Sequence, residues 1–161
     1  MLAFLYGPTA QSQITRGAQP GEIYISINWY IDNSGNLHDA IFRSTDNGEN
    51  LTLQYETLYN PPPEEMRLGR VLGDATPGAL YNWGWNELWV SFDYGVNWEY
   101  REDYSYAYYA TGFSNGEIYR RSDYNIYRSE NYGETFELIV ESLSDPLFDV
   151  GNQDKQLSKM I

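Results

Sequence analysis

The chain has 161 residues and carries 10 Lys and Arg against 23 Asp and Glu, which gives a formal net charge of −13 at pH 7. A field of that sign repels polyanions, so the composition argues against nucleic acids and anionic membrane surfaces as partners. With 42% hydrophobic and 17% aromatic residues, the chain is too apolar for a disordered acidic tail, and we expect one folded domain over residues 1–161.

Cysteine and histidine are too few for several kinds of site. The chain has no Cys, which excludes disulfides, thiolate metal sites and cysteine nucleophiles. Its single histidine, His38, cannot form a multi-histidine metal site, and any Ser-His-Asp triad would depend on it alone. No apolar run approaches the roughly 20 residues of a membrane-spanning helix, and residues 1–6 lack the basic region of a signal peptide. We therefore expect a soluble protein whose targeting segment, if it is exported, is not within this sequence.

Short runs of aromatic and β-branched residues recur along the chain, bounded by Gly, Asn, Asp and Pro. Examples in chain order are residues 22–30, 87–91 and 117–121. Such runs predict strands and turns, and no stretch keeps the periodicity of an amphipathic helix. Residues 154–161 are the one helix candidate. The sequence thus predicts an all-β fold.

One eight-residue frame occurs three times, each time directly after a predicted strand. The copies begin at Ser44, Ser91 and Ser129 and read Ser-Thr-Asp-Asn-Gly-Glu-Asn-Leu, Ser-Phe-Asp-Tyr-Gly-Val-Asn-Trp and Ser-Glu-Asn-Tyr-Gly-Glu-Thr-Phe. Repetition of this kind is the signature of an architecture built from stacked units. Three repeat units are therefore predicted.

A second shared element precedes each frame and contains Gly21, Gly78 or Gly116, followed by an aliphatic residue and a tyrosine. From this glycine to the third frame position the distance is 15 residues in the second and third units and 25 in the first. We assign the ten-residue excess to residues 28–39, which contain the turn-forming string Asp-Asn-Ser-Gly-Asn. The first unit is thus expected to carry an extended hairpin.

The residue types of the frame suit a tight turn. The acid can accept backbone N–H bonds across the turn, the glycine supplies a positive φ, and the last apolar residue packs beneath the hairpin. Asn131 in the third copy keeps an acceptor oxygen but has no charge. The predicted structural turn residues are Ser44, Asp46, Gly48, Ser91, Asp93, Gly95, Trp98, Ser129, Asn131, Gly133 and Phe136.

These three segments resemble the Asp-box, or BNR, repeats of sialidase-like and sortilin-like proteins and of repeat proteins secreted by Bacteroidetes. The resemblance implies a β-propeller, in which each box closes the hairpin between the third and fourth strands of a blade. It implies about three four-stranded antiparallel units, at residues 12–59, 67–102 and 106–140. The implied strands are 12–17, 22–31, 37–44 and 51–59, then 67–72, 79–85, 87–91 and 97–102, and finally 106–111, 117–122, 125–129 and 135–140.

Three blades do not close a ring, because propellers have about four to eight blades and open edges expose unpaired backbone groups. The unit would then be an incomplete ring or part of a larger propeller. Three arrangements would cover the open edges: the chain belongs to a longer propeller, it pairs with a partner or a second copy, or residues 2–6 and 146–150 form strands that cover the edges.

An enzyme is the alternative that the resemblance invites. A sialidase-like enzyme needs an arginine triad, a tyrosine nucleophile assisted by a glutamate, and an Arg-Ile-Pro motif, which does not occur in this sequence. Arg16, Arg67 and Arg70 lie on predicted inner strands without matching flanks. We expect no catalytic residues, and convergence of these arginines in one pocket would favour the enzyme.

Aromatic side chains are the predicted ligand contacts, at Trp83, Tyr104, Tyr106, Tyr108 and Tyr109. Residues two apart on a strand share a face, so these side chains could form platforms for sugar rings. Alternate aromatics also fill the space between packed blades, and the sequence leaves both explanations open.

No metal site or cofactor is predicted. Residues 32–36 and 46–49 carry oxygen ligands, but neither segment fits the EF-hand pattern, and Ca²⁺ is only a secondary possibility. The favoured function is a non-enzymatic, extracellular binding or assembly module of bacterial origin. Its partner would be a protein or glycan, with a homo-oligomer or further blades as the alternative, and recognition is expected from loops 28–39, 60–66 and 104–109.

Overall fold

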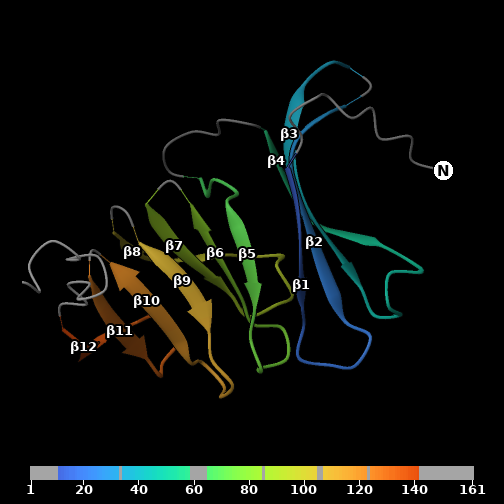
Figure 1. Ribbon diagram of the computed structural model, residues 1–161. Helices are drawn as coiled ribbons and strands as arrows, with labels where there is room; N and C mark the ends of the chain where they lie inside the picture. Colours follow the sequence, from blue (N-terminus) through green and yellow to red (C-terminus); the bar gives the residue numbers. More distant parts are fainter. Residues whose placement is uncertain are drawn as a thin grey trace, which may run out of the picture.

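The computed structural model describes residues 11–32, 34–58, 65–84, 86–104, 107–122 and 124–141. These residues form three four-stranded sheets and no helix, so none of them belongs to a helix that could cross a membrane (Figure 1). The prediction of an all-β fold with three antiparallel four-stranded units is confirmed. Residues 1–10 and 142–161, which hold the predicted edge strands and the helix candidate, lie outside the described residues.

Each sheet is a simple meander in which every strand pairs with the next one in the chain. We refer to the sheets as blades 1, 2 and 3. Blade 1 contains β1 (Gln11–Arg16), β2 (Ile23–Ile31), β3 (Leu37–Ser44) and β4 (Thr52–Leu58). Blade 2 contains β5 (Arg70–Gly73), β6 (Leu80–Gly84), β7 (Glu87–Ser91) and β8 (Glu99–Asp103). Blade 3 contains β9 (Tyr108–Thr111), β10 (Ile118–Ser122), β11 (Asn125–Ser129) and β12 (Glu137–Val140).

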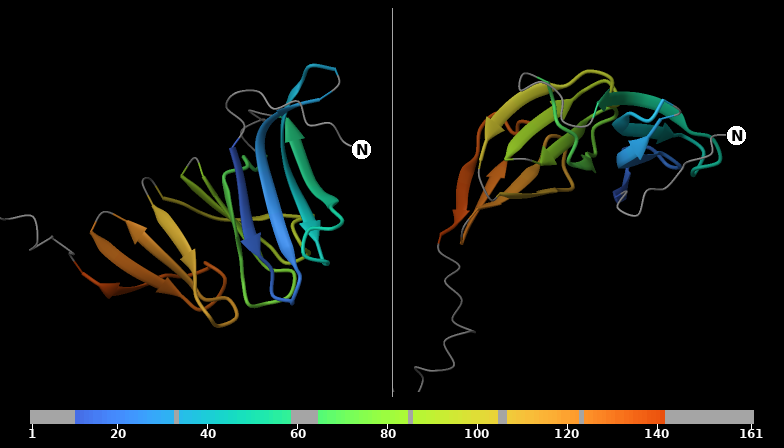
Figure 2. Two further views of the ribbon diagram at one scale, coloured as in Figure 1. Left: turned by 45° about the vertical axis from the view of Figure 1, so that its right-hand side comes forward. Right: turned by 90° about the horizontal axis from the view of Figure 1, so that it is seen from above.

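The blades fan out around one side of the molecule, as the view from above in Figure 2 shows. Their first strands, β1, β5 and β9, are neighbours on the inner side of the fan, and β4, β8 and β12 form the outer edges. The fan is open, so blade 1 and blade 3 each have one face without a neighbouring blade among the described residues.

Two hydrophobic clusters hold the blades together, one in each interblade space. Alternating side chains on the strands supply them because successive residues point to opposite faces of a sheet. The cluster between blades 1 and 2 contains Tyr24, Ile41, Met66, Leu68, Val71 and Leu80, with Trp89 and Trp98 packed against it. The cluster between blades 2 and 3 contains Tyr81, Leu88, Val90, Ala107, Tyr109 and Ile118, with Trp83, Tyr104 and Phe136 packed against it.

The serine-containing turns join the third and fourth strands of each blade and share one geometry. The Ser44 hydroxyl donates to Asp46 Oδ1 at 2.7 Å and accepts the Gly48 N–H at 2.9 Å, while Asp46 Oδ1 accepts the Asn50 N–H at 2.9 Å. The second copy repeats these bonds at 2.9, 2.9 and 2.8 Å, and the third at 2.9, 2.9 and 3.0 Å. The uncharged Asn131 therefore accepts the same two bonds as the aspartates.

The two repeated sequence elements meet in space at this end of each blade. The backbone N–H that follows each acid position donates to the carbonyl of the upstream glycine, at 2.9, 2.9 and 3.0 Å in blades 1, 2 and 3. The accepting glycines, Gly21, Gly78 and Gly116, have φ angles of 76°, 83° and 72°, a region that glycine enters without steric cost. This bond links the hairpin of the first two strands to the hairpin of the last two.

Candidate functional site

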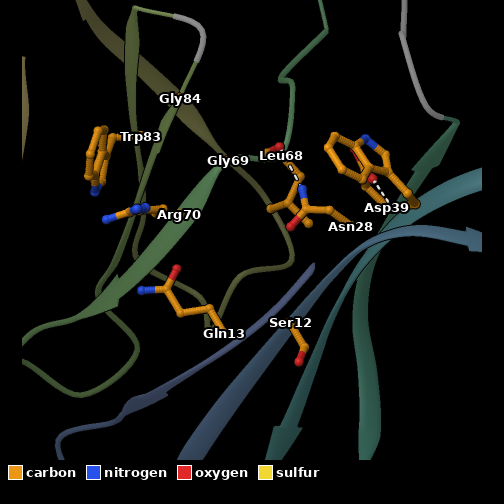
Figure 3. Close-up of a pocket in the computed structure, with 10 residues that line it drawn as sticks. Ser12, Gln13, Asn28, Asp39, Leu68, Gly69, Arg70, Trp83 and Gly84 are labelled. Carbon is orange, nitrogen blue, oxygen red and sulfur yellow. Dashed lines mark hydrogen bonds between the residues drawn. The ribbon is translucent and has the colours of Figure 1, made fainter. Parts of the chain in front are cut away.

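A cavity of about 630 Å³ opens between blades 1 and 2 at the end of the blades opposite the serine-containing turns (Figure 3). It lies where β1 and β5 begin and where β2 and β6 end. The lining residues come from both blades and from the segment that connects them: Ser12, Gln13, Asn28, Trp29, Asp39, Leu68, Gly69, Arg70, Trp83 and Gly84.

The wall on blade 1 is shaped by a β-bulge between Ile27 and Tyr30. Trp29 lies in this bulge with a φ of 65°, a conformation that bulky residues rarely adopt. Its backbone N–H donates to Asp39 Oδ1 at 2.9 Å. Asp39 is only 3% exposed, and this burial raises the pKa of its carboxyl, although the Trp29 bond acts in the opposite direction. The bulge thus turns the chain toward the cavity and is fastened by a buried acid.

The segment between β4 and β5 is held by two asparagines. Asn28 Nδ2 donates to the Leu68 carbonyl at 2.9 Å. The fully buried Asn82 accepts the Gly69 N–H at 2.8 Å and donates to the Arg67 carbonyl at 2.8 Å. Gly69 also approaches Gly84 so closely that a Cβ on Gly69 would stand 2.7 Å from the Gly84 Cα. Because a side chain at either position would clash with the other glycine, the two backbones can approach each other closely at the floor of the cavity.

The opposite side of the cavity carries a cation beside an indole. The Arg70 guanidinium carbon lies 5.3 Å from the centroid of the Trp83 ring, a distance at which a cation and a ring attract each other. Arg70 is exposed, and no described carboxylate forms an ion pair with it. Trp83 Nε1 is buried without a hydrogen bond to any described residue. Figure 3 shows Arg70 and Trp83 together on the blade 2 side of the cavity and Asn28 on the blade 1 side.

The predicted aromatic ligand contacts divide into two groups. Trp83 lines the cavity, and its ring touches Tyr108, which is 58% exposed, with centroids 5.8 Å apart. Tyr109 is 9% exposed, and its hydroxyl donates to Glu102 Oε1 at 3.0 Å. Tyr104 lies beneath the Arg120 guanidinium at 4.0 Å. Tyr109 and Tyr104 are therefore interface residues between blades 2 and 3, and Tyr106 lies outside the described residues.

Of the three arginines considered for a sialidase-like triad, one lines the cavity. Arg70 does so from the start of β5, whereas the backbone of Arg16 adjoins Gly73 at the other end of that strand. Arg67 precedes β5, and its carbonyl is bound by Asn82. Among the described residues, no three His, Asp or Glu side chains gather in a way that could hold a metal ion.

Three cavity residues, Asn28, Trp29 and Asp39, fall within residues 28–39, where the sequence predicts an insertion and a recognition loop. No single-sequence pattern predicts the bulge itself or singles out these three residues. The glycines at positions 69 and 84 were the missed signal, because isolated glycines at strand ends mark close backbone approach.

Comparisons with known proteins bear on the fold. No family model matches the chain, and no curated protein matches its sequence. A solved structure described as YCF48 bound to D1 peptide is similar in fold, with a TM-score of 0.50 and 12% sequence identity. The fold is propeller-like. The match covers 86% of this chain and 45% of that one, so this chain spans less than half the length of its neighbour.

Proposed function

We propose that the chain is a non-enzymatic binding module that holds a segment of a protein partner in the cavity between blades 1 and 2. One observation carries the proposal: the cavity presents the Arg70 guanidinium, without a described carboxylate partner, beside the Trp83 ring and the amides of Gln13 and Asn28. A guanidinium binds a carboxylate through charge-assisted hydrogen bonds, and an adjacent aromatic ring contacts apolar side chains. The ligand is thus a peptide that carries a carboxylate within an apolar or aromatic stretch.

The charge of the whole chain limits how acidic this peptide can be. The net charge of −13 repels polyanions at long range, whereas Arg70 acts only within a short distance. A segment with one carboxylate avoids most of this repulsion and still forms the local ion pair.

The peptide in the solved neighbour is in line with a protein partner for this fold, although the two chains share only 12% identity. The separation of Arg16 from Arg70 along the inner strands supports a module without glycosidase chemistry. The Asp-box resemblance supports an extracellular location, which fractionation of the source cells would test.

The test uses fluorescence anisotropy with two labelled libraries of eight-residue peptides. Both carry apolar and aromatic residues around one fixed central position, which is Glu in the first library and Gln in the second. We expect the Glu library to bind more tightly. Arg70→Gln should weaken its binding roughly 10- to 100-fold, the equivalent of about 1.5–3 kcal/mol for a hydrogen bond to a charged group.

Arg16→Gln is the matched control, because Arg16 is an exposed arginine on the neighbouring inner strand, β1, and does not line the cavity. It should leave binding unchanged. Equal binding of the two libraries, or equal loss in the two variants, would contradict the proposal. Binding of neutral oligosaccharides in place of both libraries would favour the glycan partner, for which the exposed Tyr108 ring is the available platform.

A further inference from the structure

The two interblade spaces are built from the same pair of faces. We define the leading face of a blade as the one that packs on the preceding blade, and the trailing face as the one that packs on the following blade. The core positions on these faces are all at most 9% exposed. The leading positions are Val71 and Leu80 in blade 2 and Tyr109 and Ile118 in blade 3; the trailing positions are Tyr24 and Ile41 in blade 1 and Tyr81 and Leu88 in blade 2.

Blade 1 presents a leading face that no described blade covers. Strand register aligns Ile14 with Val71 and Tyr109, since each pairs with the corresponding residue of the second strand. Ile14 is 66% exposed, whereas Val71 is 1% exposed. An apolar row crosses all four strands of this face, because Ile14 pairs with Ile25, Ile25 with Phe42 and Phe42 with Leu53.

Blade 3 presents the complementary trailing face. Tyr119 and Ile126 occupy the positions of Tyr24 and Ile41, but they are only half-buried. Tyr119 nevertheless lies in the same set of polar contacts as Tyr24, which belongs to a covered trailing face. Glu117 Oε1 accepts the Tyr119 hydroxyl at 2.7 Å and Arg128 Nε at 2.9 Å.

The same arrangement lies in the covered interface between blades 1 and 2. There, Glu22 Oε1 accepts the Tyr24 hydroxyl at 2.9 Å and Arg43 Nε at 2.8 Å, and the Arg43 guanidinium lies 3.8 Å from the ring centroid of Tyr94 on blade 2. The free face of blade 3 therefore repeats a surface that binds a leading face within this chain.

We propose that the leading face of blade 1 binds the trailing face of blade 3 in a second copy of this chain. The contact continues the blade-to-blade packing that the chain itself forms twice. Each copy offers one leading face and one trailing face that no described blade covers, and a head-to-tail contact of this type forms a ring if its rotation closes. In the proposed arrangement two copies would form one such ring. It is independent of peptide binding in the cavity.

The experiment measures solution mass by light scattering over a concentration series of the full chain. We expect twice the chain mass of 18.7 kDa, falling toward a single chain on dilution. Ile14→Asp on the leading face and Ile126→Asp on the trailing face should each give a monomer. Near-ultraviolet circular dichroism checks that both variants remain folded.

Mixing the two variants tests the direction of the contact. The Ile14→Asp variant keeps an intact trailing face, and the Ile126→Asp variant keeps an intact leading face. An equimolar mixture of the two should therefore recover a dimer, with weaker affinity than the native chain. Phe113→Asp is the control, because Phe113 is fully exposed and its equivalent, Ala75, stays exposed beside blade 3. It should leave the mass unchanged.

Three outcomes would overturn the proposal. The first is a native chain that stays monomeric throughout the series. The second is a dimer that Ile14→Asp dissociates and Ile126→Asp does not, which would indicate two leading faces packed together. The third is a folded pair of variants whose mixture stays monomeric.

Discussion

The two ends of the blades differ in how much they vary. At the turn end, the three serine-containing turns have the same hydrogen bonds in all three blades, and each donates to the upstream glycine in the same way. At the cavity end, blade 1 differs from the other two in how its second and third strands are joined. Blade 1 has a bulge and pairs Ile31 with Leu37, whereas blades 2 and 3 join these strands across two residues, with Gly84 paired to Glu87 and Ser122 to Asn125. The repeated turns stabilise the fold, and the cavity end, where blade 1 departs from the repeat, is where we propose that the partner binds.

The largest expected effect at the turn end comes from Ser91→Ala. Ser91 is 1% exposed, and its Oγ accepts the buried Gly95 N–H at 2.9 Å. Without that acceptor the N–H stays buried and unpaired, so the free energy of unfolding should fall by about 1–3 kcal/mol. Urea unfolding measures the change. The exposed Ser114→Ala is the control and should stay within about 0.5 kcal/mol of the native value. Equal free energies of unfolding for the two variants would contradict the claim that the turn serine stabilises the fold more than an exposed serine does.

A smaller effect is expected from acid. Hydrogen bonds from Ser44 and Asn50 lower the pKa of Asp46 from 3.8 to about 2, and bonds from Tyr119 and the backbone lower that of Glu117 from 4.5 to about 2. Because the folded pKa lies below the unfolded one, these groups stabilise the fold fully above about pH 4.5. That contribution is lost as the pH falls toward 2.

Asp46→Asn should make the fall in stability between pH 4.5 and pH 2 shallower, because an uncharged amide keeps the acceptor, as Asn131 does in blade 3. Thermal unfolding at pH 5, 3.5 and 2.5 would measure this. The exposed Ser114→Ala, which changes no titratable group, is the control and should leave the pH profile unchanged. A profile that Asp46→Asn does not alter would show that the turn carboxylate contributes nothing to the acid response.

The turn end could be predicted from the sequence because its chemistry is local. Ser44, Asp46 and Gly48 lie within five residues, so their types alone specify which atoms can meet. The cavity could be predicted only in part. Trp83 was identified from its aromatic character, but the contact of Asn28 with Leu68 joins residues 40 apart and depends on how two blades pack.

The tyrosine-rich segment shows a second limit of pattern analysis. Strand alternation predicts that Tyr104 and Tyr108 share one face, but β9 begins only at Tyr108. Tyr104 lies outside the strand and packs on Arg120, which Glu102 binds through both carboxylate oxygens. The ion pair joins β8 of blade 2 to β10 of blade 3, so the position of Tyr104 depends on how two blades pack, which no local sequence pattern reports.

The most direct test of the account is to locate a bound peptide. A peptide from the Glu library that carries a photo-crosslinker would be attached to the protein by irradiation, and the modified residues would be identified by mass spectrometry. We predict attachment at the cavity, within residues 28–29, 68–70 and 83–84. Attachment concentrated at the serine-containing turns, residues 44–51, 91–98 and 129–136, would contradict the claim that one end of the blades builds the fold and the other binds the partner.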